Sequence, residues 1–255
     1  MDTDARSPEL PWIEPDQALP WAACAWGADS PAPGLLAASK DLSPLRLYEA
    51  YSQGIFPWFS LGQPVLWWSP NPRMVLHTRE FRCHRSLRKT LQHWWRQPGF
   101  ELSFDRDFGQ VIRRCSQAPR SGQKGTWILP SMISAYEEFH ELGHAHSAEV
   151  WLNGELVAGL YFVAIGHAVF GESMFTTVTD GSKMALATLV SVCLQHGLPA
   201  IDCQQNTRHL ASMGAREIPR SDFIRLITQE QHKPNIDWAT QTLHWSTLMA
   251  LEKTR

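Results

Sequence analysis

Two acidic side chains and one amide stand in apolar segments, where they could bind and move a proton. Glu172 follows the apolar residues 168–171, and Asp202 and Gln204 lie two residues apart in a second apolar segment. A carboxylate among apolar residues loses hydration, so it needs a cation, hydrogen-bond donors or water. Glu172 is therefore either a strand-end acid turned to solvent or a buried anion that receives a basic group of a substrate.

Residues 198–204 are predicted to form a strand, in which side chains alternate between two faces. Asp202 and Gln204 then share one face, and Cys203 lies on the other. A carboxylate beside an amide could orient an attacking amine and accept its proton, directly or through a relay. As an alternative, Asp202 could cap the loop that follows. Cys203 has no histidine at a predictable partner position, so we interpret it as a packing residue.

One short match to a zinc motif is present. Residues 140–144 read His-Glu-Leu-Gly-His, the spacing that places two zinc ligands on one helical face. Gly143 stands where the helix would have to continue to present His144, and glycine is typical of a helix end. The five cysteines include no C-x-x-C pair. We therefore predict no metal site.

Positive charge is concentrated between residues 79 and 96, where five arginines and one lysine face a single acid. Arg85, Arg88 and Lys89 are three and four residues apart, so they share one face of a predicted helix. A solvated charged face is one interpretation. The other is a contact with a phosphate backbone, which makes binding depend on salt. The second gains weight because the whole chain has a formal net charge of −2.

Tryptophan is abundant, with twelve in the chain. Most of them are expected to be core residues, but single aromatic side chains in loops can also stack on a flat ligand. Trp58 and Trp127 are in such loops. For each of them, packing at a domain interface is at least as good an explanation as binding a ligand.

The scaffold of these residues is predicted from hydrophobic periodicity. Residues 145–152 and 155–164 alternate apolar and polar side chains around Asn153-Gly154, the strongest short hairpin signal. A third strand, a helix and a returning strand follow, over residues 167–172, 182–195 and 198–204. This is the order of elements in acyl-CoA N-acetyltransferases, so we predict an α+β fold with a mixed, mostly antiparallel sheet.

The cofactor of those enzymes is not expected. In their fold, the helix after the third strand begins with a glycine-rich turn whose N–H groups hold a pyrophosphate. Here the loop over residues 175–183 contains one glycine, and Asp180 would repel a phosphate. A coenzyme A-dependent N-acetyltransferase therefore remains only an alternative.

Composition is that of a globular protein. The chain has 255 residues, of which 44% are hydrophobic and 19% charged, enough for one large domain or two modest ones. Its longest apolar stretch is far below the ~20 residues of a membrane span, and the N-terminus has no signal-like pattern. We predict a cytoplasmic protein with an irregular arm (1–33) and a tail (230–255).

Seven motifs follow one another between residues 34 and 229. They are GIFPWF (54–59), LWWSPNPR (66–73), TWI (126–128), GHAHSAEVW (143–151), FGESMF (170–175), IDCQ (201–204) and HLASMGA (209–215). Together and in this order, they resemble the bacterial leucyl/phenylalanyl-tRNA–protein transferases. The resemblance implies transfer of Leu or Phe from aminoacyl-tRNA to the N-terminal Arg or Lys of a protein, which marks that protein for N-end-rule degradation.

The resemblance also implies a small N-terminal α/β domain (34–80) packed on an acetyltransferase-like catalytic domain (81–229). It implies roles for matching residues, and no cofactor, metal or membrane. The catalytic centre would hold Asp202, Gln204 and Glu172. The terminal adenosine of the tRNA would stack among Trp58, Trp127 and Tyr51. The pocket for the Leu or Phe side chain would have walls of Met174, Phe170 and Ile201. The tRNA backbone would meet Arg85, Arg88 and Lys89.

Within this resemblance, we assign Asp202 with Gln204 to orienting the acceptor amine and accepting its proton. Glu172 is assigned to pairing with the basic side chain of the acceptor, and which acid does which task stays open. Since one methylene changes binding by only ~1–3 kcal/mol, Met is expected as a weak donor. Phe162 stands where family members commonly have glycine, and it would narrow donor choice if it pointed into the pocket. A non-catalytic tRNA-binding module is the remaining alternative.

Overall fold

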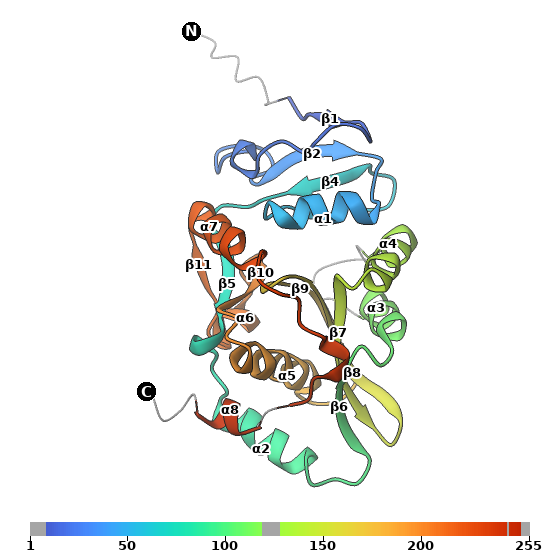
Figure 1. The fold of residues 1–255 in the computed structure, drawn as a ribbon, viewed down its shortest axis with the longest axis vertical. Coiled ribbons are helices and arrows are strands. Elements are labelled where there is room, and N and C mark those ends of the chain that lie inside the picture. Colours follow the sequence, from blue (N-terminus) through green and yellow to red (C-terminus); the bar gives the residue numbers. More distant parts are fainter. Residues whose placement is uncertain (1–8, 119–127, 244, 251–255) are drawn as a thin grey trace.

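Residues 9–118, 128–243 and 245–250 are described in a computed structural model of the chain, in which they form two sheets with packed helices (Figure 1). The smaller sheet has the strand order β1-β2-β4-β3. Its strands are β1 (Trp12–Ile13), β2 (Leu35–Ser39), β3 (Phe56–Pro57) and β4 (Val65–Trp68). The 3-10 helix η1 (Ala22–Cys24) precedes β2, and α1 (Pro44–Ser52) lies between this sheet and the rest of the molecule.

Helix α1 begins where the sequence favours a helix start. Ser43 Oγ accepts a hydrogen bond from the backbone N–H of Arg46, and Pro44 is the first helical residue. The inner side of the helix buries Tyr51 completely, and the ring of Tyr51 lies 5.1 Å from that of Phe170 in the larger sheet. α1 thus carries Tyr51 to the boundary between the two sheets.

The larger sheet has seven strands in the order β11-β5-β10-β9-β8-β7-β6. They are β5 (Arg73–His77), β6 (Phe100–Phe104), β7 (Ala145–Leu152), β8 (Glu155–Ile165), β9 (Ala168–Thr176), β10 (Ala200–Gln204) and β11 (Arg216–Ile218). Among these strands, β9 and β10 pair in parallel and every other neighbouring pair is antiparallel. The predicted α+β class with a mixed, mostly antiparallel sheet is confirmed.

The centre of this sheet has the predicted order of elements. β7 and β8 pair around Asn153 and Gly154, whose φ angles of 51° and 80° suit a tight hairpin turn. β9 pairs with β8, α5 (Gly181–Gln195) then crosses one face, and β10 returns beside β9. This confirms the acetyltransferase-like arrangement of three antiparallel strands, a helix and a returning strand.

Helices cover both faces of the larger sheet. α3 (Phe108–Gln117) and α4 (Pro130–Glu141) pack on the face to which Tyr161 of β8 points. α5 packs on the other face, where the neighbouring Leu160 joins its cluster. The other helices are α2 (Arg85–Trp94), α6 (Arg208–Ser212), α7 (Arg220–Glu230), α8 (Trp245–Ala250), η2 (Thr78–Glu80) and η3 (Trp238–Thr240). In the described ranges, no helix is long and apolar enough to cross a bilayer.

The two sheets divide the chain differently from the predicted domains. Residues 73–77 form β5 of the larger sheet, although the sequence predicts them in the small domain. Within the predicted arm, β1 pairs in parallel with β2. The predicted tail enters the core, because Trp238 is only 2% exposed. These differences have one cause: strand pairing and burial join distant residues, and local composition does not report them.

Trp238 packs against Phe162, the residue that departs from the family pattern. Phe162 is fully buried, and the two ring centroids lie 4.8 Å apart in an edge-to-face arrangement. Phe104 and His146 complete this aromatic cluster. Phe162 therefore points toward the C-terminal segment, and it is not among the residues that line the cavity described below.

Phe162→Leu is expected to lower the free energy of unfolding by about 1–3 kcal/mol, because it removes ring contacts and leaves a partial cavity. Urea unfolding followed by circular dichroism measures this change. Trp21→Leu is the matched control, since Trp21 is 78% exposed, and it should stay within about 0.5 kcal/mol. An unchanged unfolding curve for Phe162→Leu would show that the aromatic cluster does not hold the C-terminal segment.

Candidate active site

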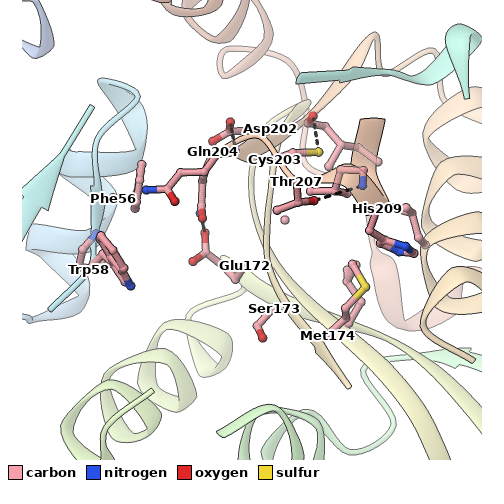
Figure 2. Close-up of a pocket in the computed structure, with 17 residues that line it drawn as sticks. Phe56, Trp58, Glu172, Ser173, Met174, Asp202, Cys203, Gln204, Thr207 and His209 are labelled. Atoms are coloured by element: carbon pink, nitrogen blue, oxygen red, sulfur yellow. Dashed lines mark hydrogen bonds between the residues drawn. The ribbon is translucent and has the colours of Figure 1, made fainter. Parts of the chain in front are cut away.

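A cavity of about 430 Å³ lies between the smaller sheet and the ends of β9 and β10. Residues 56–58 of the smaller sheet, 171–174 of β9 and 201–205 of β10 and the loop after it supply much of its wall. Figure 2 shows Trp58 at one end of the cavity and Met174 at the other. Between them, Glu172 and Gln204 point toward each other (Figure 2).

The cavity exists because β9 and β10 stop pairing before they end. In their parallel pairing, Val169 lies beside Ile201 and Phe170 lies beside Asp202. Beyond these pairs, the register of β9 against β8 and that of β10 against β5 both shift. The residues that follow on the two strands therefore line an opening between β9 and β10, while β9 continues its ladder with β8.

The irregular end of β10 changes which side chains face the cavity. Gln204 has a φ of 60°, and its backbone N–H donates to Asp202 Oδ1 over 2.9 Å. The prediction that Cys203 faces away from the site is wrong, because strict alternation ends at this shift and Cys203 lines the cavity. Burial raises the pKa of the Cys203 thiol well above its usual range. Cys203 is thus a neutral wall residue rather than a thiolate nucleophile.

Asp202 is held by a buried cation. Arg73 of β5 donates from Nε to Asp202 Oδ1 over 2.8 Å and from Nη2 to Oδ2 over 2.6 Å. The third nitrogen, Nη1, donates to the carbonyl of Gly54 over 3.1 Å. Both charged side chains are fully buried. Because both of its carboxylate oxygens accept hydrogen bonds from the guanidinium, Asp202 is held toward Arg73, and this geometry does not fit the proton-accepting task predicted for it.

Glu172 presents the carboxylate that the cavity can use. It is half-buried, and its Oε1 accepts a hydrogen bond of 2.8 Å from Gln204 Nε2. Burial raises the pKa of Glu172 to about 7, and the charge of Asp202 acts in the same direction. Hydrogen bonds from Tyr51 and Gln204, and the charge of Arg73, oppose this rise. Such a group changes protonation near neutral pH, as a general base should.

The residues predicted to hold the adenosine are not all in the cavity. Trp58 lines it, and its ring lies 5.4 Å from that of Trp68. Tyr51 is fully buried, so no face of its ring is open for stacking, and that part of the prediction is corrected. Trp127 lies outside the described residues.

Two of the three side chains predicted to form the side-chain pocket line the cavity. Met174 and Ile201 line the cavity, together with Leu160 and Leu186, which sequence reasoning missed. The prediction for Phe170 is wrong. Its side chain is fully buried against Tyr51, on the face of the sheet opposite to Leu160 and α5. Leu160 and Leu186 carry no local signal beyond an apolar strand and an apolar helix, so only the packing of α5 on β8 identifies them.

The basic helix α2 offers its charges to solvent. Arg85 and Lys89 are exposed and Arg88 is half-buried. Nearby, Thr90 Oγ1 donates to Asp180 at the N-terminal end of α5, over 3.3 Å. Lys183 pairs with the same carboxylate over 2.6 Å. An acid thus stands where a coenzyme pyrophosphate would lie, which opposes the acetyltransferase alternative.

The zinc-like motif does not form a two-ligand helical face. α4 ends at Glu141, and Gly143 takes a φ of 77° before His144. His140 instead has its Nδ1 2.7 Å from the carbonyl of Ala145. The helix end was the predicted interpretation of these residues, and the backbone agrees with it.

His140 does approach two other possible ligands, Asp105 and His146, with ligand atoms within 4.8 Å of one another. His146 Nδ1 lies 2.8 Å from Asp105 Oδ2, and His146 Nε2 lies 3.2 Å from the carbonyl of Gly143. Both ring nitrogens of His146 therefore face oxygen acceptors, and hydrogen bonding accounts for the cluster.

Comparison with known proteins agrees with this arrangement. The family profile described as "Leucyl/phenylalanyl-tRNA protein transferase" matches residues 75–228, and the profile of its N-terminal domain matches residues 40–71. The first range contains Glu172, Asp202 and Gln204.

Relatives named leucyl/phenylalanyl-tRNA–protein transferase share about half of their residues with this chain. The Polaromonas sp. strain JS666 protein is 54% identical over 244 residues, 96% of each chain. The Albidiferax ferrireducens protein is 51% identical over 97% of this chain and 98% of its own. The Paraburkholderia phytofirmans protein is 55% identical over 90% of this chain and 94% of its own. By motif, profile and near-complete alignment, the chain belongs to the leucyl/phenylalanyl-tRNA–protein transferase family.

Proposed function

We propose that this enzyme transfers Leu or Phe, and Met weakly, from aminoacyl-tRNA to the N-terminal Arg or Lys of a protein. The product marks the protein for N-end-rule degradation in the cytoplasm. One observation carries the proposal: a single cavity joins an aromatic face, a half-buried carboxylate with a raised pKa and an apolar end. These three features correspond to the adenosine, the reacting amine and the donor side chain.

The donor lies along the cavity. The terminal adenosine stacks on Trp58, which is worth ~1–3 kcal/mol without reading tRNA sequence. The Leu or Phe side chain enters the apolar end, between Met174, Ile201 and Leu160. The basic face of α2, with Arg85, Arg88 and Lys89, contacts the phosphates of the acceptor stem.

The acceptor brings positive charge to a site that favours it. Among the described residues that line the cavity, none is Lys or Arg, and of its two acids Asp202 is already paired with Arg73, so Glu172 supplies the available negative charge. His209 also lines the cavity, and burial with the nearby charge of Lys183 lowers its pKa, so its imidazole is neutral at pH 7. The α-amino group arrives largely protonated, because its pKa is near 7.7–8.0.

Glu172 removes a proton from this amine, and Gln204 orients the amine. The neutral amine nitrogen then bonds to the ester carbonyl carbon, and the bond from that carbon to the ribose oxygen breaks. The leaving ribose oxygen takes up the second proton that the nitrogen loses as the amide forms. The ester is already activated, so placement and a neutral amine suffice. Asp202 acts through Gln204. It accepts a hydrogen bond from the backbone N–H of Gln204 and so fixes the backbone turn at that residue.

Transfer of radiolabelled amino acid to peptides tests this function. We expect label from Leu- and Phe-tRNA, and less from Met-tRNA, on peptides that begin with Arg or Lys but not with Ala. Val-tRNA and Lys-tRNA should give much less label, because Val branches at Cβ and Lys would bring a charge among apolar walls. Equal use of Val-tRNA would contradict the pocket. Label on the Ala peptide would remove the role of acceptor charge, and bound tRNA without any label would favour a binding module.

A further inference from the structure

Two buried tyrosines meet directly behind the proposed base. Tyr51 comes from α1 and Tyr136 from α4, and their hydroxyl oxygens lie 2.5 Å apart. Both side chains are fully buried. Burying a hydroxyl is unfavourable unless it is hydrogen-bonded, and a phenylalanine would fill either position without that requirement. Packing therefore explains the two rings but not the two hydroxyls.

The hydroxyl pair has a proton to offer to Glu172. Each phenol carries one proton, so when one hydroxyl donates to the other, one proton remains. Glu172 is the acceptor within reach: its Oε2 lies 3.5 Å from the Tyr136 hydroxyl, and Tyr51 also hydrogen-bonds to this carboxyl group. Burial and the charge of Glu172 raise the pKa of both phenols well above 10, so they remain donors at all working pH values.

We propose that Tyr51 and Tyr136 are positioning residues that hold the Glu172 carboxylate and favour its ionised form. The idea rests on the proposed function, in which Glu172 is the base. It also replaces the stacking role predicted for Tyr51 with one that a fully buried phenol can fill. The two residues come from helices on either side of the boundary between the sheets, so the same contact ties the base to the docking of α1.

The groups that face Glu172 come from four elements besides β9. Tyr51 lies on α1, Tyr136 on α4, Asp202 and Gln204 on β10, and Arg73 on β5. Burial and Asp202 disfavour the ionised carboxylate, whereas Gln204, Arg73 and the phenol donors favour it. Loss of a phenol donor leaves the disfavouring influences unchanged, so the pKa of Glu172 must rise above its value of about 7.

The experiment titrates Glu172 directly in the full-length protein. Glutamate labelled with carbon-13 at the δ-carboxyl reports its ionisation by NMR, and Glu172→Gln assigns the signal. We expect the double variant Tyr51→Phe/Tyr136→Phe to raise the midpoint by about one pH unit, as loss of a hydrogen bond to a charged group should. Each single variant should raise it by less, because the remaining hydroxyl keeps a proton for the carboxylate. The acid limb of the pH–rate profile should move upward with it.

Tyr48→Phe is the matched control, because Tyr48 lies on the same helix, is 40% exposed and contacts His144 rather than the carboxylate. It should leave the midpoint unchanged. An unshifted Glu172 signal in the folded double variant would overturn the inference, whatever the activity. A wild-type midpoint near 4.5 would instead contradict the base role itself, so failures of the two proposals are distinguishable. Thermal melting confirms that each variant is folded.

Discussion

Glu172→Gln is expected to slow transfer by about 10²–10⁴-fold while aminoacyl-tRNA binding stays unchanged, because it removes the proposed general base and little else. Glutamine keeps the size of the side chain and can still hydrogen-bond to the Gln204 amide. Single-turnover transfer to an Arg peptide measures the rate, and filter binding measures the tRNA affinity. Glu217→Gln on exposed β11 is the matched control and should leave both unchanged.

The same substitution has an opposite effect on stability. Folding raises the pKa of Glu172 from 4.5 to about 7, so the native state binds this proton more tightly than the unfolded chain. The contribution of Glu172 to stability is therefore full below about pH 4.5 and is lost as pH rises through about 7. Glu172→Gln should unfold at a higher temperature than wild type at pH 8, and activity and stability should move in opposite directions.

Two outcomes would change the assignment. Retention of more than a tenth of the transfer rate by Glu172→Gln would remove the base role. A variant that binds the Arg peptide more weakly, yet transfers normally at saturating peptide, would return Glu172 to pairing with the basic side chain of the acceptor. The separation of rate from peptide affinity thus decides which acid does which task.

Arg73→Met is expected to lower the free energy of unfolding by about 3–5 kcal/mol, because it leaves the Asp202 charge buried without its partner. Methionine has a similar length and fits between the rings of Phe56 and Phe223, which lie 4.8 and 4.5 Å from the guanidinium carbon. The loss should therefore come from charge rather than from packing. Chemical denaturation measures it.

A second substitution separates charge from position. Adding Asp202→Asn to Arg73→Met removes both buried charges, and the Asn oxygen can still accept the Gln204 backbone N–H. Most of the lost stability should return. If Asp202 only positions Gln204, the double variant should also transfer amino acid at close to the wild-type rate. A stable double variant without activity would restore Asp202 as the proton acceptor. Arg216→Met is the control, since its pair with Glu80 is about half exposed and such pairs contribute only ~0.2–1 kcal/mol.

Much of the fold could be predicted from the sequence because its signals are local. The hairpin at Asn153-Gly154, the start of α1 at Ser43-Pro44 and the end of α4 before Gly143 all depend on residues within a few positions of one another. The order of strands and helices that follows from them was sufficient for the fold class. The motifs were sufficient for the family, because they are read from residue identity and do not require coordinates.

The working arrangement of the site depended on tertiary structure. Arg73 and Asp202 are 129 residues apart, and Tyr51 and Tyr136 are 85 apart, so no local period could pair them. The same limit hid the entry of Trp238 into the core and the burial of Phe170. Residue types alone therefore named the two acids and the amide. Only strand register and helix docking decided that one acid is held by a buried cation, whereas the other faces the cavity as the proposed base.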